Sequence, residues 1–287
     1  MYIYLCEMFE IYKININQLS NNENPGLITH QNFALNRGVK VADAIGAVMK
    51  FGEPYRFMES RIVRVLKGFI RISVNLEEYR PIADEALYIG QNSVVEILEY
   101  SPDAVVDLLG FALANKSANI RNLYHLKKEC NSWLEMYFQL LHTLSRSEAF
   151  DMRSIDYLLQ SLHCHIVAYH QHTCCGASQT KGRKEELFRK FIELLNIYIG
   201  KHKLPFYAEK MNISPQYLSR LVEDSSGTAA RDWINRAVVL QAKLLLRNSK
   251  YTIEQITEEL NFSTVPYFCR LFKREVGTTP TEYRNKG

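Results

Sequence analysis

The sequence predicts an α+β protein, in which a mostly β N-terminal domain is followed by an all-α C-terminal domain. Three observations lead to this prediction. Short segments that alternate apolar and polar residues, separated by turn sequences, occupy residues 1–125. Farther along the chain the apolar residues recur at three- and four-residue spacing, which is typical of amphipathic helices. One helical pattern near the C-terminus also occurs twice, with Tyr217 of the first copy matching Tyr267 of the second.

The strand candidates follow one another at short intervals in the first domain. Residues 62–66 and 69–76 flank Lys67-Gly68 and predict a β-hairpin. Further apolar segments span residues 47–51, 86–89, 94–100 and 104–111, and turn sequences separate them. Several short strands at this spacing predict a small barrel or sandwich.

Two apolar stripes come after the strands. The first runs from Leu123 to Leu144 and the second from Ile155 to Tyr169, with Ser145-Arg146-Ser147 between them. This spacing predicts an αα-hairpin. The stripes suit either of two roles, covering the strands or forming a dimer contact, and both remain open.

The repeated pattern occupies residues 208–220 and 257–270. Each copy reads as a short helix, an Asn, an apolar residue, a Ser and a second helix. Asn tolerates the left-handed backbone of a tight corner, and Ser214 and Ser263 are expected to cap the helices that follow. This is the pattern of a helix-turn-helix. The matched residues are Tyr217, Leu218 and Arg220 in the first copy and Tyr267, Phe268 and Arg270 in the second.

Residues 228–247 lie between the two copies and predict one continuous linker helix. It separates two expected recognition helices, at residues 214–224 and 264–276. A rigid spacer of this kind would set them about 34 Å apart, which is one turn of DNA. One chain would then occupy two successive major grooves.

The residues of this C-terminal stretch resemble the DNA-binding domain of the AraC/XylS family of bacterial transcription regulators. The resemblance rests on Tyr217–Leu221, Gly227, Ala242, Leu245-Leu246, Ile253–Ile256, Phe262-Ser263, Tyr267–Arg274, Gly277, Thr279-Pro280 and Glu282–Arg284. The sequence departs from the family pattern at Val238, Thr257, Asn261 and Pro266, which bears on sequence specificity rather than on the fold. The resemblance implies a cytoplasmic transcription regulator that binds double-stranded promoter DNA, with RNA polymerase as a further partner.

The resemblance also implies a domain order. Residues 1–172 would form a cupin-like β-barrel with the αα-hairpin, residues 173–183 a linker, and residues 184–287 the DNA-binding domain with its two helix-turn-helix motifs. In the resembled family the first domain senses a small-molecule effector, and its helices often hold a homodimer together. The candidate effector contacts are Tyr55, Arg56, Phe57, Arg71 and Tyr88; the alternative is that these side chains simply pack or face water.

The two recognition helices supply the candidate DNA contacts. The expected base contacts are Gln216, Ser219, Arg220, Pro266, Cys269 and Arg270, and the expected backbone contacts are Lys273 and Arg274. Gln can recognise adenine and Arg guanine through paired hydrogen bonds. Tyr217, Leu218 and Leu221 are expected on the buried side of the first helix. The alternative for Arg220 and Arg270 is a salt bridge at the protein surface.

A cluster of His and Cys offers an alternative function, that of a metal- or redox-sensing regulator. It comprises His163, His165, His170, His172, Cys174 and Cys175. On a helix, His163 and His170 would share one face, with Cys174 one turn farther on, and these are ligands that zinc or copper accepts. The spacing matches no known structural metal site, so we expect a solvated helix end and no bound metal. Metal-binding cupins also need two His and a Glu on adjacent strands, but the chain has no His between His30 and His125, so no cofactor is expected.

Composition and charge narrow the function further. Residues 1–180 contain 16 Lys and Arg against 19 Asp and Glu, whereas residues 181–287 contain 19 against 12. The positive excess therefore lies with the repeated pattern, where a phosphate backbone would attract it. The six Cys have no regular framework, and no apolar run is long enough to span a bilayer, so a cytoplasmic protein without a membrane anchor is expected. No nucleophile–base pair, metal triad or phosphate loop is present, which argues against an enzyme.

Overall fold

The computed structural model describes residues 13–14, 27–30, 33–48, 51–113, 123–177, 183–198, 203–247 and 251–285. The chain divides into two compact units after Gly176. The N-terminal unit, Lys13–Gly176, is mixed β and α, and the C-terminal unit, Ala177–Gly287, is helical. The α+β class that the sequence predicts is confirmed. No helix in the described residues is both long and apolar enough to cross a membrane.

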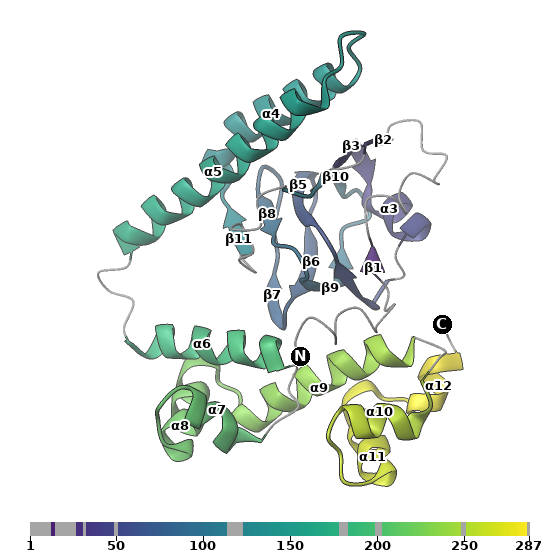
Figure 1. Ribbon diagram of the computed structural model, residues 1–287, viewed down its shortest axis with the longest axis vertical. Helices are drawn as coiled ribbons and strands as arrows, with labels where there is room; N and C mark the ends of the chain where they lie inside the picture. The colour runs from purple at the N-terminus through teal and green to yellow at the C-terminus, as the bar shows by residue number, and fades with distance from the viewer. Residues whose placement is uncertain are drawn as a thin grey trace. The chain divides into compact units, whose positions relative to one another are not determined.

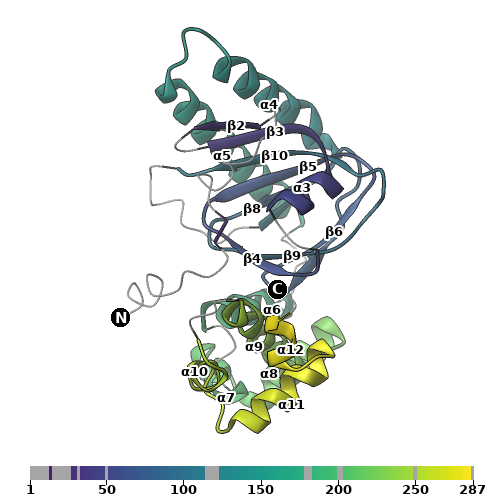
Figure 2. The same ribbon diagram turned by 90° about the vertical axis from the view of Figure 1, so that its right-hand side faces the viewer.

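The strands of the N-terminal unit form two sheets (Figures 1 and 2). The five-stranded sheet has the order β1 (Lys13–Ile14), β4 (Pro54–Phe57), β9 (Val94–Tyr100), β6 (Ile70–Val74) and β7 (Glu77–Tyr79). The six-stranded sheet has the order β11 (Leu123–Leu126), β8 (Ala86–Ile89), β5 (Ser60–Lys67), β10 (Val105–Phe111), β3 (Phe33–Lys40) and β2 (Leu27–His30). Within the described part of the chain the sheets do not join into a closed barrel.

The hairpin expected around Lys67-Gly68 is wrong, because β5 and β6 lie in different sheets. β5 pairs with β8 and β10, while β6 pairs with β7 and β9. Val65 of β5 and Ile72 of β6 instead meet in the apolar core between the sheets. Gly68 has a left-handed φ of 74°. A β-carbon added at this position by a substitution would lie 2.0 Å from Ser101 Oγ. Its turn therefore carries the chain from one sheet to the other.

A second correction concerns the segment at residues 47–51. Val41–Val48 is helix α3, so residues 47 and 48 end a helix instead of beginning a strand. Three of the eight residues in α3 are Ala, the strongest helix former, and this local preference outweighs the short apolar run. The segments at residues 86–89, 94–100 and 104–111 do form strands β8, β9 and β10.

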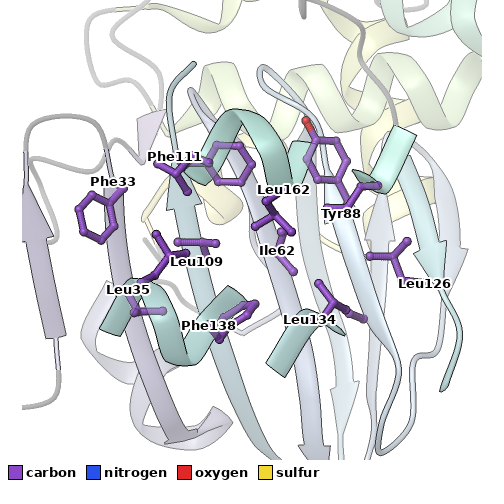
Figure 3. Packing of buried hydrophobic residues seen from close by; sticks show 14 of the residues in the cluster. Phe33, Leu35, Ile62, Tyr88, Leu109, Phe111, Leu126, Leu134, Phe138 and Leu162 are labelled. Carbon is purple, nitrogen blue, oxygen red and sulfur yellow. The ribbon is translucent and has the colours of Figure 1, made fainter. Parts of the chain in front are cut away.

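Two apolar cores stabilise the N-terminal unit, one on each face of the six-stranded sheet. Along β8, Leu87 and Ile89 belong to the core between the sheets, and Tyr88 to the core beneath the helices, as the period of two in a strand requires. The helices α4 (Asn131–Ser145) and α5 (Met152–Ala177) cover the second core. The short 3-10 helix η2 (Lys128–Cys130) leads into α4. The two helices of the predicted αα-hairpin are present, but the first does not begin at Leu123, because Leu123–Leu126 is strand β11, paired with β8. Figure 3 shows Phe138 and Leu162 facing the sheet residues of this core.

A buried charge network also ties α4 to the sheet. Asp107 of β10 is fully buried, and Arg64 of β5 is 5% exposed. Glu135 of α4 accepts hydrogen bonds from Arg37 Nη2 at 2.7 and 2.9 Å and forms a close ion pair with Arg64. Asp107 accepts from the backbone N–H of Gly38 at 2.8 Å. The two cations and two carboxylates balance in charge, which is what makes their burial tolerable.

The C-terminal unit is built around one long helix. Its elements are α6 (Arg183–Tyr198), α7 (Leu204–Lys210), α8 (Pro215–Ser226), α9 (Ala230–Leu246), α10 (Ile253–Glu259), α11 (Val265–Val276) and α12 (Pro280–Asn285). In Figure 1, α9 runs between the α7–α8 pair and the α10–α11 pair. Ten of its seventeen residues are buried, because it packs against helices on both sides. The linker helix that the sequence predicts at residues 228–247 is thus present as α9.

Candidate nucleic-acid interface

The two helix pairs turn their corners in the same way. Asn212 and Asn261 have φ angles of 54° and 56°, the left-handed backbone expected of Asn between α7 and α8 and between α10 and α11. Gly227 and Gly277 then end α8 and α11 with φ angles of 66° and 86°. Their N–H groups donate to carbonyls four residues earlier, at 2.8 and 2.9 Å. Both copies are therefore bounded by equivalent turns.

The helix caps are equivalent too, but only the first lies at the residue that the sequence predicts. Ser214 Oγ accepts a hydrogen bond from the N–H of Tyr217 at 3.1 Å, as expected. In the second copy, Thr264 Oγ1 accepts from the N–H of Tyr267 at 3.4 Å, so Ser263 is not the cap. The second copy has one more residue between its Asn and its Tyr, and this shifts the cap by one position.

The candidate base contacts lie on the outer side of α8 and α11. Gln216 and Arg220 are exposed and Ser219 is half-buried. Pro266 and Arg270 are exposed and Cys269 is half-buried, which repeats the pattern residue for residue. The buried sides consist of Leu218, Leu221 and Val222 in α8 and Phe268, Leu271 and Phe272 in α11. Helices α8 and α11 therefore expose equivalent positions, although most of the side chains at those positions differ.

Tyr217 does not lie on the buried side where we expected it. Its side chain is 41% exposed, and that of Tyr267 is 40% exposed. Residues three apart share a helix face, so Tyr217 lies on the side of Arg220 rather than on that of its neighbour Leu218. The expectation applied an alternating pattern to a helix. The outward stripe of each recognition helix therefore begins with an exposed Tyr.

The two recognition helices differ in charge at their C-terminal ends. α8 ends with Glu223 and Asp224, where α11 has Lys273 and Arg274. Asp224 forms a salt bridge with Lys184 of α6, with the Lys Nζ 2.9 Å from the carboxylate, and this hydrogen bond raises the pKa of Lys184. Arg274 pairs with Glu275 at 2.6 Å. The helix α11 is thus the more electropositive of the two.

Side chains after each recognition helix hold the pairs against the rest of the unit. Trp233 of α9 donates from Nε1 to Ser226 Oγ at 3.0 Å, and Arg284 of α12 donates to the carbonyl of Tyr251 at 2.7 Å. These contacts were not predicted. The repeat offset continues past Gly227 and Gly277 and aligns Trp233 with the aromatic Tyr283, but it aligns Arg284 with the apolar Ile234 and so gave no signal for that contact.

Comparison with known proteins identifies this unit. Residues 207–286 match the family model described as a helix-turn-helix domain. The chain carries an AraC-type helix-turn-helix domain. It is 33% identical over 94 residues to the regulatory protein PocR of Salmonella typhimurium, covering 31% of each chain. It is 32% identical over 102 residues to the virulence regulon transcriptional activator VirF of Yersinia enterocolitica, covering 36% of this chain and 37% of that one.

Two solved structures also match parts of the chain. The C-terminal domain of AraT, a response regulator from Geobacillus stearothermophilus, is 28% identical with a TM-score of 0.33, and the match covers 37% of this chain and 89% of that one. ToxT from Vibrio cholerae, solved with an unsaturated fatty acid bound, is 14% identical with a TM-score of 0.36, and the match covers 89% of this chain and 95% of that one. The chain spans about a third of the length of the curated relatives it matches. VirF is named as a transcriptional activator and PocR as a regulatory protein.

Outside the AraC-type domain, the five candidate effector residues do not gather at one place. Tyr55 and Phe57 are buried between the two sheets, whereas Tyr88 is buried on the opposite face of the six-stranded sheet. Arg71 is on the surface, where it pairs with Glu99 at 3.1 Å and with Glu78 at 3.4 Å. Arg56 Nη1 donates to the carbonyl of Asn92 at 3.4 Å. Because alternate residues of a strand point to opposite faces, residues chosen along the sequence are distributed over both.

The His residues of α5 point in different directions. His163 Nδ1 lies 3.1 Å from the hydroxyl of Tyr88, and burial lowers the pKa of His163. The ring of His170 lies 4.2 Å from that of Tyr124, while His165 stacks on Trp133 of α4 at 4.4 Å. His172 is exposed, and the side chains of Cys174 and Cys175 lie outside the described residues. Among the described residues, no group of three or more His, Cys, Asp or Glu is arranged to hold a metal ion.

Proposed function

We propose that the protein is a sequence-specific transcription regulator whose C-terminal unit binds double-stranded promoter DNA. One observation carries this proposal: α8 and α11 present Arg220 and Arg270 at equivalent, exposed positions of an AraC-type domain. Arg can hydrogen-bond the edge of guanine through two N–H groups. The expected base contacts are the six residues Gln216, Ser219, Arg220, Pro266, Cys269 and Arg270, with Lys273 and Arg274 on the backbone.

The proposal includes two helix-turn-helix motifs and the domain order given above. Helices α7 and α8 would form the first motif, and α10 and α11 the second. Residues 1–172 would be a cupin-like sensor, 173–183 a linker and 184–287 the DNA-binding domain. The cupin-like assignment is supported by two sheets that enclose an apolar core, and the effector by the family resemblance.

A homodimer is part of the proposal as well. Met136 and Leu140 of α4 are 69% and 46% exposed, and Tyr157 of α5 is 72% exposed. Exposed apolar side chains on a helical hairpin favour a contact with another chain. The protein would act in the cytoplasm, where it would meet RNA polymerase at the promoter. Analytical ultracentrifugation of the full chain, with and without the substitution Leu140→Asp, measures whether this face forms the dimer.

Binding-site selection tests the central proposal. The full chain is incubated with random double-stranded DNA, bound duplexes are amplified, and the affinity for the selected duplex is measured across salt concentrations. Two recognition helices that enter successive major grooves should select two short elements about 10–10.5 base pairs apart. The affinity should fall steeply as salt rises, because bound cations release counterions from phosphates. A chain that enriches no sequence would contradict the proposal.

A further inference from the structure

The outward face of each recognition helix continues beyond the Arg. In α11 the residues Tyr267, Arg270 and Arg274 are spaced by three and four positions, so they form one stripe on the helix. The same positions in α8 are Tyr217, Arg220 and Asp224. The stripe thus begins with a half-exposed phenol in both copies and has an Arg in the middle. It ends with a cation in one copy and an anion in the other.

The carboxylate of Asp224 in α8 forms a salt bridge with a cation from helix α6. Asp224 Oδ2 accepts a hydrogen bond from Lys184 Nζ at 2.9 Å, and the Lys side chain remains 61% exposed. A Lys ammonium has three N–H donors, so this bond leaves donors for another ligand. A positive group therefore stands at the end of the α8 stripe as it does in α11, although it comes from α6.

Along each stripe the cation stands two helical turns from the Tyr, Arg274 by its own position and Lys184 through its hydrogen bond to Asp224. The pKa of Lys184 is raised chiefly by Asp224, with a further contribution from Tyr217. The pKa of Arg274 is raised chiefly by Glu275, with smaller contributions from Asp232 and then Tyr267. On a helix, long side chains lean toward the N-terminus, so a cation two turns after a Tyr reaches back toward it. Each copy therefore combines a neutral O–H donor with a cation beside the central Arg.

We propose that Tyr217 with Lys184, and Tyr267 with Arg274, form two equivalent sites that bind DNA phosphates on the flank of each recognition helix. This inference rests on the proposed DNA-binding function and extends it, because neither Tyr nor Lys184 was a predicted contact. A phenol O–H and a cation are suited to the oxygens of one phosphodiester. The sites position the helices without reading sequence. In the first copy, the salt bridge from Asp224 takes the place of the Arg that the second copy has.

The test measures binding of the full chain to a fluorescent duplex from the selection and to a scrambled duplex. Lys184→Ala should weaken both by about tenfold and lower the salt slope by about 0.9, the value for one lost phosphate contact. Lys190→Ala is the matched control, because Lys190 is exposed on the same helix and its substitution removes the same charge.

Tyr217→Phe and Tyr267→Phe should each weaken the affinity for both duplexes about three- to tenfold, as expected for one lost hydrogen bond. Tyr100→Phe, on β9 of the N-terminal unit, should change nothing.

A rescue variant separates a local phosphate site from a general effect of charge. Lys184→Ala combined with Asp224→Arg rebuilds in α8 the arrangement of α11 and should restore the affinity and the salt slope. Lys184→Ala combined with Glu193→Arg adds an Arg at an exposed position elsewhere on α6 and should restore neither. Equal rescue by both, or equal loss in Lys184→Ala and Lys190→Ala, would overturn the inference. Failure of the wild-type chain to bind any duplex would instead contradict the proposed function.

Discussion

Arg220 and Arg270 occupy equivalent positions, yet their neighbours give them different surroundings. In α8 the neighbours Gln216 and Ser219 both carry groups that can hydrogen-bond base edges. In α11 the corresponding residues are Pro266 and Cys269. A Pro offers no donor, and burial raises the pKa of the Cys269 thiol, which keeps it a weak donor. We therefore expect α8 to read sequence and α11 to bind mainly the backbone.

Two substitutions test this division of roles. Arg220→Ala should cost about 1–3 kcal/mol of binding free energy on the selected duplex and relax the preference under the first motif. Lys273→Ala should weaken binding to all sequences alike and lower the salt slope by about 0.9. Site selection with each variant checks both. The assignment is wrong if the stronger consensus lies under the second motif, or if Arg220→Ala selects the same sequence as the wild type.

At the scale of the element, the local sequence determines where a helix begins and ends. The corners at Asn212 and Asn261 depend on the backbone preference of a single residue, so the sequence predicted them, whereas the role of Gly227 and Gly277 in ending the helices was not predicted. The cap of α11 was misplaced from Thr264 to Ser263, because both residues can cap a helix. Only the position of the first helical turn, which the extra residue in the second copy shifts, distinguishes them.

This correction leads to a test of the cap itself. Thr264→Ala should lower the free energy of unfolding of the C-terminal unit by about 1 kcal/mol, since the N–H of Tyr267 loses its acceptor. Ser263→Ala, one position earlier, should change it by less than about 0.5 kcal/mol. Urea denaturation followed by the fluorescence of Trp233 measures both variants. A larger loss from Ser263→Ala than from Thr264→Ala would mean that α11 begins one residue earlier.

The two units differ in how far their sequences predict them. The C-terminal unit consists of helices whose apolar spacing is local and whose pattern repeats, so its helices and most of its outward residues were predicted. In the N-terminal unit five strands, β5, β6, β8, β9 and β10, were predicted, whereas β1 to β4, β7, β11 and the pairing of the strands were not. β5 is joined to β6 by a short turn but pairs with β10, far along the chain, and Val65 of β5 and Ile72 of β6 lie in the same core between the sheets. The scatter of Tyr55, Arg71 and Tyr88 over three surroundings follows from the same non-local pairing.

The charge network of the N-terminal unit depends on that pairing, since it joins β3, β5, β10 and α4. Burial raises the pKa of Glu135, but hydrogen bonds from Arg37 and Arg64 outweigh it and hold the pKa below its ordinary value. A carboxyl group whose pKa is lower in the folded state contributes its full stabilisation of the fold at pH values above its unfolded pKa, which is about 4.3 for Glu. Its contribution is lost as the pH falls through the folded value. The N-terminal unit should therefore lose stability below about pH 4.3.

Two Trp residues make it possible to follow the units separately, because Trp133 lies in α4 and Trp233 in α9. Glu135→Gln leaves Arg64 without its close carboxylate. Breaking a fully buried pair costs about 3–5 kcal/mol, but Glu135 is 38% exposed, so solvent should reduce the loss to about 1–3 kcal/mol. In Trp233→Phe protein, whose fluorescence reports the N-terminal unit, Glu135→Gln should lower the urea midpoint. In Trp133→Phe protein the midpoint should stay unchanged.

The exposed Glu148→Gln, which removes the same charge from the loop between α4 and α5, serves as the control and should move neither midpoint. The charge network and both apolar clusters beside it lie within Lys13–Gly176. Loss of the network should therefore destabilise that unit alone. If Glu135→Gln lowers the Trp233 midpoint as much as the Trp133 midpoint, the two units unfold together, and the division after Gly176 does not mark independently folding parts.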